Sequence, residues 1–412
     1  MVVNMTRAEN KSDHETHCAN ETYTRRDVFQ KYLLYSGYSN IEINEKVLSL
    51  SAENLVIGDE ELKSIGILAA IASDYNLQYK IITSHLVFDT EIHLDLSQDI
   101  TFISKNDIRF TEKARLIQKG NGNIYLKSGI DNDHGKVIFE NKNEKQMKIE
   151  SESKIYIHYH PEANKSSEYN HKYHNAYKYS QHIESNSLIT SYMLVNDIND
   201  LQNIRLFSSG NYALSQNIDG SETINWNEGK GFKPVKMLSK YLSEPAPFSG
   251  NFDGNNFSIS GLFIKRPSEN YVGLFGVTTG FQEFYREIKD LTLTDITVSG
   301  HKYVGLISGK SDFAKFNNIF ISNAIIEAYD LGGGVFGTGS NINLDAITCN
   351  SVSINMEELE NKPPATKGLL AGAIRNSEIG TNMCCSDYGT IELDANCFGY
   401  SLDISYILTE GH

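Results

Sequence analysis

This chain of 412 residues has no long apolar runs, few prolines and few cysteines. No apolar stretch of about 18 residues occurs, so no transmembrane helix and no membrane insertion are expected. The opening MVVNMTRAENKSDHETHC has no apolar core of a signal peptide, so export would need a non-classical route or a signal that is missing here.

The five cysteines do not indicate a disulfide framework, because their number is odd and Cys384 and Cys385 are adjacent. Their spacing matches no zinc pattern, so we expect ordinary thiols. The net charge of −15 repels phosphate backbones and anionic lipids, which argues against nucleic acid as a partner. Glycans, cations and basic proteins remain possible partners. The protein is expected to be a monomer.

Most of the sequence consists of short segments in which apolar and polar residues alternate, separated by Gly, Asn, Asp and Ser. This pattern is typical of short strands joined by turns. From 77 to 158, pairs such as Ile100 and Phe102 repeat this pattern, and each such strand buries only one face. Stacked coils would supply the missing core. Residues 25–36 and 59–72 instead show helical spacing, which predicts a terminal cap and a helical insertion.

The second half contains a repeat that can be counted. The pieces YVGLFG, YVGLISG, GGGVFG and KGLLAGA align on Leu274, Leu306, Val335 and Leu369. A second element between them aligns on Leu293, Ile321 and Ile347. The glycines suit places where coils approach closely, and the asparagines between the strands suit tight corners with stacked amides. The prediction is an all-β, right-handed parallel β-helix.

Two passages, SYMLVNDINDLQNIRLFSSGNYALSQNIDGSETINWNEGKGFKPV and FSGNFDGNNFSISGLFIKRPSENYVGLFG, resemble the GLUG-repeat region of filamentous haemagglutinin-like proteins of two-partner secretion. The resemblance spans about residues 45–380. It implies a right-handed parallel β-helix and an adhesive role at the bacterial surface or after secretion. The secretion domain of such proteins is not recognisable here.

The expected organisation has six parts. They are a polar flexible amino terminus (1–24), a helical cap (25–44), a first β-helix section (45–158), a His/Tyr-rich loop (159–187), family-like coils with Trp226 (188–247), and a GLUG-like β-helix section with carboxyl-terminal coils (248–412).

The segment 155–182 has the most unusual composition, with five of the twelve histidines. Imidazoles bind transition metals, and tyrosines stack on sugars or anchor protein partners. The alternative is a projecting loop without a ligand. The candidate metal ligands are His158, His160, His171 and His174. The candidate ligand contacts are Tyr169, Tyr173, Tyr177, Tyr179 and Trp226. For Trp226, packing is the first interpretation and a platform for a sugar is the alternative.

No catalytic centre is predicted. Asp253 lies in an Asp-Gly turn with too few acidic neighbours for a calcium loop, and no other cofactor is indicated. Asp290 and Asp295 near Lys289 and Lys302 would serve a lyase or glycoside hydrolase only if they converged.

Three functions follow as hypotheses. The first is a non-enzymatic adhesin-like protein that presents a β-helix face to a host glycan or protein. The second is a carbohydrate-active β-helix enzyme, and the third is a secreted effector or toxin component delivered into host cells.

The circular dichroism spectrum in the far ultraviolet should be dominated by β-structure, and a mainly helical spectrum would contradict the predicted fold.

Overall fold

The structure is a computed structural model, and it describes residues 2–3, 23–24, 40–43, 47–58, 72, 77–162, 172–173, 176–185, 188–235, 246–282, 284–356, 366–368, 370–379, 383–386 and 398–406. The chain divides into two compact units, of which the first comprises 1–130, 134–159 and 178–190 and the second comprises 131–133, 160–177 and 191–412. Among the described residues, no helix has both the length and the apolar character to cross a bilayer.

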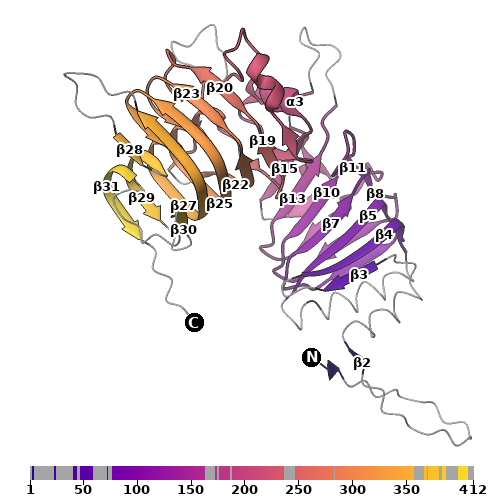
Figure 1. Cartoon of the computed structure of the whole chain (residues 1–412). Coiled ribbons are helices and arrows are strands. Elements are labelled where there is room, and N and C mark those ends of the chain that lie inside the picture. Colours follow the sequence, from indigo (N-terminus) through magenta and orange to yellow (C-terminus); the bar gives the residue numbers. More distant parts are fainter. Residues whose placement is uncertain are drawn as a thin grey trace, which may run out of the picture. The chain divides into compact units, whose positions relative to one another are not determined.

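Unit 1 is a stack of short parallel strands (Figure 1). Its larger sheet contains β4 (Val47–Ile57), β5 (Gln78–Phe88), β7 (Ile100–Ser104), β8 (Ile108–Phe110), β10 (Ile124–Ser128), β11 (Val137–Phe139) and β13 (Ile155–Tyr159). A second sheet contains β6 (Glu91–Leu94), β9 (Arg115–Gln118), β12 (Met147–Ile149) and β14 (Ile183–Ser185). A short 3-10 helix, η1 (Tyr179–Gln181), precedes β14.

The inward residues of unit 1 stack in columns along the solenoid. Phe88, Phe110 and Phe139 occupy equivalent positions on successive coils, with ring centroids 4.3 and 4.7 Å apart. These rings are buried, as are the apolar pairs of the alternating pattern, such as Ile100 and Phe102. The alternation therefore identified the core-facing side chains correctly.

The first coil of unit 1 is paired with an antiparallel strand. Within the segment 25–44, predicted as a helical cap, Asn40–Ile43 forms β3 and pairs with β4. An extended partner satisfies the edge hydrogen bonds of β4, which a helix cannot do. Residues 25–39 and 59–71 lie outside the described residues, and Ala72 is helical. β1 (Val2–Val3) and β2 (Tyr23–Thr24) form a separate antiparallel pair.

Unit 2 begins with short elements. These are β15 (Ile189–Val195), α3 (Ile198–Asn203), η2 (Ile204–Phe207), β16 (Tyr212–Leu214), β17 (Ile218–Asp219), η3 (Ser221–Asn225), β18 (Phe252–Asp253), β19 (Ser258–Ser260) and β20 (Phe263–Arg266). Longer coils follow in β21 (Phe275–Thr279), β22 (Arg286–Thr294), β23 (Thr297–Gly300), β24 (Val304–Gly305), β25 (Ser308–Ala328), β26 (Leu331–Gly333), β27 (Phe336–Met356), β28 (Thr366–Gly368), β29 (Ala371–Ile379), β30 (Met383–Ser386) and β31 (Phe398–Tyr406).

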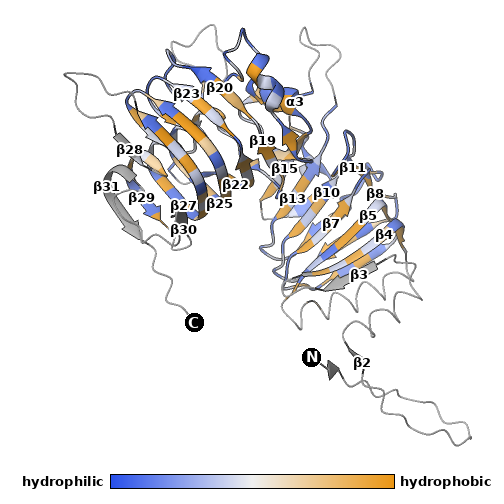
Figure 2. Ribbon diagram, in the orientation of Figure 1, coloured by the Kyte–Doolittle hydropathy of each residue, from blue (hydrophilic) through white to orange (hydrophobic). Residues whose placement is uncertain are grey.

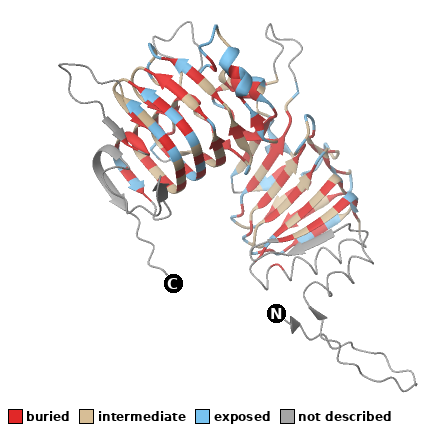
Figure 3. Ribbon diagram, viewed as in Figure 1, coloured by how far each residue is buried: buried red, intermediate tan, exposed pale blue. Residues whose placement is uncertain are grey.

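Apolar and polar residues alternate along the strands of both units (Figure 2), and burial alternates with them (Figure 3). In unit 2 the strands β22, β25 and β27 are parallel and in register over long stretches. Together these observations confirm the predicted all-β parallel solenoid.

Single residues in the left-handed conformation bend the long strands at corners. Asp290 and Asn318 lie at one corner with φ of 51° and 52°, and Asp295 and Asn323 lie at the next with φ of 55° and 51°. Asn318 Nδ2 donates to Asp290 Oδ1 at 2.7 Å, and Asn323 Nδ2 donates to Asp295 Oδ1 at 3.4 Å. Asn and Asp tolerate this conformation better than most residues, which explains their recurrence.

The observed register corrects the repeat alignment in three places. The pairs on either side of Val335, Gly305 with Gly333 and Ser308 with Phe336, are both 28 residues apart, so Val335 lies opposite Ile307 rather than Leu306. Ile321 pairs with Leu293 as predicted, but its partner on the following coil is Cys349 rather than Ile347. A shift of two residues keeps the same face inward, so the apolar pattern alone cannot detect it. The amide of Val335 donates to the carbonyl of Leu370, so the fourth repeat lies one residue later than Leu369 predicts.

The recurring glycines lie where coils approach closely. A Cβ atom on Gly305 would come within 2.5 Å of the Cα of Phe336, and one on Gly273 within 2.5 Å of the carbonyl oxygen of Gly305. Both contacts are with backbone, which cannot move aside without breaking the ladder. Glycine is therefore required by the spacing of the coils, as the repeat predicted.

Replacing Ile321 by Asp should lower the free energy of unfolding by at least about 3 kcal/mol, because a charge would enter a fully buried column. Ile325→Asp is the matched control, since Ile325 lies on the same strand but is 44% exposed. Chemical denaturation of both variants checks this, and equal losses of stability would contradict the register.

Candidate functional site

Two tyrosines of the predicted ligand segment are core residues. Tyr173 is completely buried, its hydroxyl donates to the carbonyl of Leu194 at 2.6 Å, and its ring meets Tyr212 edge-to-face at 5.1 Å. Tyr179 is 3% exposed and packs edge-to-face on Tyr159 at 5.5 Å. The expectation that these two rings contact a ligand is corrected, because neither is accessible.

The other predicted contacts have different positions. Tyr177 is 46% exposed, while Tyr169 lies outside the described residues. Trp226 is half-buried, and its backbone closes a turn by donating to the carbonyl of Thr223 and accepting from the amide of Gly231. A ligand role for Tyr177 and Trp226 stays a prediction.

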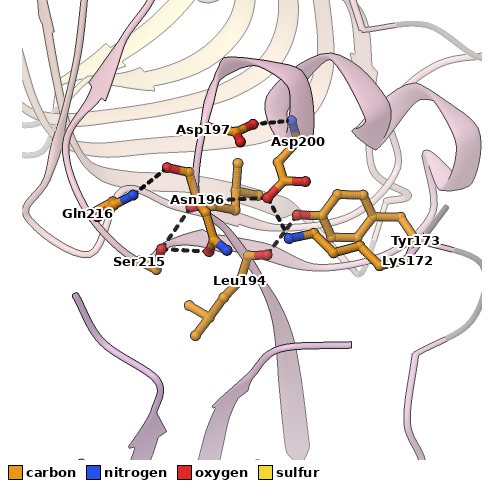
Figure 4. A network of polar contacts seen from close by, with 9 residues as sticks. Lys172, Tyr173, Leu194, Asn196, Asp197, Asp200, Ser215 and Gln216 are labelled. Carbon is orange, nitrogen blue, oxygen red and sulfur yellow. Dashed lines mark hydrogen bonds and ion pairs between the residues drawn. The ribbon is translucent and has the colours of Figure 1, made fainter. Parts of the chain in front are cut away.

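Tyr173 belongs to a polar network around the start of α3 (Figure 4). Asp197 caps this helix by accepting from the Asp200 amide at 2.8 Å, and Lys172 Nζ lies 2.5 Å from Asp200 Oδ2. Burial raises the pKa of Asp200, and the adjacent Lys172 ammonium opposes that rise. The ion pair therefore fastens the Lys172–Tyr173 dipeptide to the helix.

The same network reaches the neighbouring coil. Ser215 Oγ donates to Asn196 Oδ1 at 2.8 Å, and Gln216 Nε2 donates to the Asn196 carbonyl at 2.8 Å. Each group in Figure 4 thus has a protein partner that accounts for its position. We interpret this network as structural, because its contacts join the helix, the Tyr173 segment and a coil to one another.

The predicted metal ligands are only partly within the described chain. His158 on β13 is completely buried and pairs in register with Lys127, and His160 is 5% exposed. His171 and His174 lie outside the described residues. In the described part of the chain, no three His, Cys, Asp or Glu side chains are grouped as a metal site would need. Metal binding by these histidines stays a prediction.

The carboxylates considered for catalysis hold corners and turns. Asp290 and Asp295 accept from the amides of Asn318 and Asn323 at two different corners. Asp253 is 4% exposed, and its Oδ1 accepts from the Asn255 amide at 2.7 Å, which is turn chemistry. These contacts assign the three carboxylates to the architecture of the coils.

A different part of unit 2 gathers partly exposed aromatic and polar side chains. Three successive coils place the triplets 269–271, 301–303 and 329–331 one above another at a corner, and we call these nine residues the corner array. Backbone bonds hold the rungs together: the His301 amide donates to Glu269 at 2.8 Å and the Tyr329 amide to His301 at 2.9 Å. None of the nine residues is buried, although the residue that follows each triplet is buried.

Two tyrosines of the corner array have unusual backbones. Tyr271 and Tyr303 both have φ of 59°, and their rings are parallel with centroids 5.0 Å apart. The left-handed conformation costs about 1–2 kcal/mol for a residue with a bulky side chain. A stacked aromatic pair returns about 0.5–1.5 kcal/mol, so stacking at best offsets part of the strain of two residues. Strain retained at two partly exposed tyrosines favours a functional role.

The remaining side chains of the array are organised in pairs. His301 and Tyr329 stack at 4.6 Å, and His301 Nδ1 lies 3.1 Å from Asn270 Oδ1. Lys302 Nζ lies 3.2 Å from Asp330 Oδ2, and its hydrogen bond to that carboxylate raises the Lys302 pKa. Arg266, which is buried, donates to Glu269 at 2.7 Å. The corner array is therefore an ordered surface made of stacked rings, the amide of Asn270 and two ion pairs.

The sequence contains a pattern that predicts this array. Each triplet directly precedes the VGLFG-type repeat element, as in ENYVGLFG and HKYVGLISG. The repeat was interpreted through its buried glycines and leucines. Aromatic residues that recur at the same place before a repeat element lie above one another when the coils stack, as Tyr271 does with Tyr303.

The chain resembles known proteins only in part. No protein-family model and no solved structure matches it. Halomucin from Haloquadratum walsbyi is 35% identical over 131 residues, which are 31% of this chain and 1% of that protein. A protein of Evansella cellulosilytica named "Putative Gly-rich membrane protein" is 32% identical over 124 residues, 29% of this chain and 13% of its own length. The matches thus cover a small part of each relative.

Tyr173→Ala should lower the free energy of unfolding by about 3–5 kcal/mol, because it removes a buried ring and leaves the Leu194 carbonyl without its donor. Tyr177→Ala should change it by less than about 0.5 kcal/mol, since that ring is largely exposed. Urea denaturation compares the two variants. A neutral effect of Tyr173→Ala would restore the interpretation of this segment as a projecting loop.

Proposed function

We propose that this chain is a non-enzymatic, surface-associated binding protein of the adhesin kind, whose corner array contacts an extracellular glycan. The observation that carries the proposal is the half-buried, solvent-facing stack of Tyr271 and Tyr303 in a strained backbone conformation. Positive φ recurs at other corners of unit 2, where Asp or Asn mostly supplies it. In the array it is adopted by aromatic residues whose partly exposed rings stack on each other.

The chemistry of the array favours a glycan over a protein partner. Tyrosine hydroxyls, an imidazole and an amide lie beside aromatic rings, so apolar faces and hydrogen-bonding groups alternate over a small area. Sugars present the same combination of C–H faces and hydroxyls. Tyrosine is also frequent at the energetic centres of protein interfaces, so the proposal of a glycan rests on the repetition of rings and hydrogen-bonding groups on successive coils.

The carboxylates of the array suit binding better than hydrolysis. Asp330 faces Lys302 and Glu269 faces Arg266, so each carboxylate is held in an ion pair. We therefore assign these groups to orientation of the surface and of its ligand.

The comparisons support placing the protein at a surface. The partial likeness to Halomucin, and to a protein whose name describes it as a membrane protein, agrees with exposure of this chain outside the cytoplasm. The GLUG-like resemblance of the second half, which implies adhesion, points in the same direction. The adhesive role and its host remain part of the proposal.

Tyr303→Gly should weaken glycan binding by roughly tenfold or more while leaving the melting temperature nearly unchanged. Glycine adopts φ near 59° without strain, so relief of about 1 kcal/mol offsets the lost stack. The measurement is binding to a glycan array, with reducing-sugar and lyase assays run on the glycans that bind. Release of reducing ends or unsaturated products by the wild-type protein would instead favour the enzyme hypothesis.

Tyr125→Ala is the matched control, because Tyr125 stacks on Tyr156 at 4.7 Å in unit 1 and is likewise half-exposed. It should leave glycan binding intact. Equal binding by wild type and Tyr303→Gly would reject the corner array as the glycan site. Loss of a protein partner without any glycan binding would favour a protein ligand.

A further inference from the structure

We infer that the ligand of the corner array is a linear, uncharged polysaccharide that lies parallel to the solenoid axis, with one sugar residue opposite each rung. This inference rests on the proposed function and specifies its ligand. It follows from the direction in which the array repeats, from its charge and from the hydrogen-bonding atoms at its surface.

The array repeats along the axis and not across it. Equivalent rings of Tyr271 and Tyr303 lie 5.0 Å apart, and those of His301 and Tyr329 lie 4.6 Å apart. This spacing is set by the pairing of parallel strands. It is close to the advance of one pyranose residue in an extended β-linked chain. Across the corner the array is one triplet wide, so only a ligand that runs along the axis meets every rung.

Charge argues for an uncharged ligand. The cations beside the array are engaged by carboxylates: Lys302 by Asp330 at 3.2 Å and Arg266 by Glu269 at 2.7 Å. The whole chain carries a net charge of −15, which repels polyanions. An acidic polysaccharide would have to displace Asp330 from Lys302, whereas an uncharged one leaves both pairs in place.

The polar atoms of the array suit hydroxyl groups. Asn270 Oδ1 faces His301 Nδ1, so this ring nitrogen carries the proton and donates. In the neutral ring Nε2 is then an acceptor for a sugar hydroxyl. The hydroxyls of Tyr271 and Tyr303 both donate and accept, and they recur on adjacent rungs, as the hydroxyls of successive sugars do.

The number of rungs limits how many sugar residues of the ligand can contact the array. The third rung carries Tyr329 and Asp330, but Leu331 takes the place that Tyr271 and Tyr303 hold on the other two. The tyrosine column therefore ends after its second member, and the array after its third rung. Affinity should rise from monosaccharide to trisaccharide and then level off.

The test uses the full chain with uncharged gluco-, manno-, galacto- and xylo-oligosaccharides of one to six residues, and with uronic-acid oligosaccharides of matched length. Isothermal titration calorimetry at two salt concentrations measures affinity. At least one uncharged series should bind with the trisaccharide plateau and little dependence on salt. Tyr303→Gly and Tyr271→Gly should each weaken that binding by roughly tenfold or more, and Tyr125→Ala should not.

The outcomes separate this inference from the proposed function. Preferential binding of uronic-acid oligosaccharides, or equal affinity for a monosaccharide and a hexasaccharide, would overturn the inference about the ligand. The proposed glycan site would still stand in either case if Tyr303→Gly weakened that binding. Failure of every uncharged series to bind would also overturn it. Glycan binding that survives both tyrosine variants would overturn the proposed site itself.

Discussion

In-register hydrogen bonding between parallel strands of successive coils is the constraint on which the rest of this structure depends. Once Leu293 pairs with Ile321, and Ile321 with Cys349, every other residue of these coils has a fixed neighbour above and below it. Side chains that are distant in sequence then lie within contact distance in a row. The core columns, the corner amides and the exposed stacks are all consequences of this single rule.

The same rule has opposite effects inside and outside the solenoid. Inward, it stacks rings such as Phe88 and Phe110 in a core that excludes water, and their burial contributes to stability. Outward, it stacks Tyr271 and Tyr303 at a corner, where the rings remain accessible. Identical pairing geometry therefore yields structural columns on one side of the chain and a candidate recognition surface on the other.

Corners decide which residues become the surface. A left-handed residue turns the strand without interrupting the ladder, and Asp or Asn supplies that conformation with a side chain that bonds to the next coil, as Asn318 does to Asp290. Tyr271 and Tyr303 use the same conformation without that benefit. The same conformation occurs at Phe313, Ala346 and Ser351. The two tyrosines differ in that their rings stack on each other, and the proposed glycan site depends on that stack.

The amino-acid sequence by itself determined the parallel all-β solenoid, its inward columns and its close-packed glycines, because strand alternation and repeated Gly report directly on burial and close approach. It could not determine the register at Cys349, since a shift of two residues preserves the buried face. Only the tertiary structure decided that Tyr173 is core and that Tyr271 and Tyr303 form a surface stack. Exposure depends on which coil covers a side chain, and that neighbour lies tens of residues away along the chain.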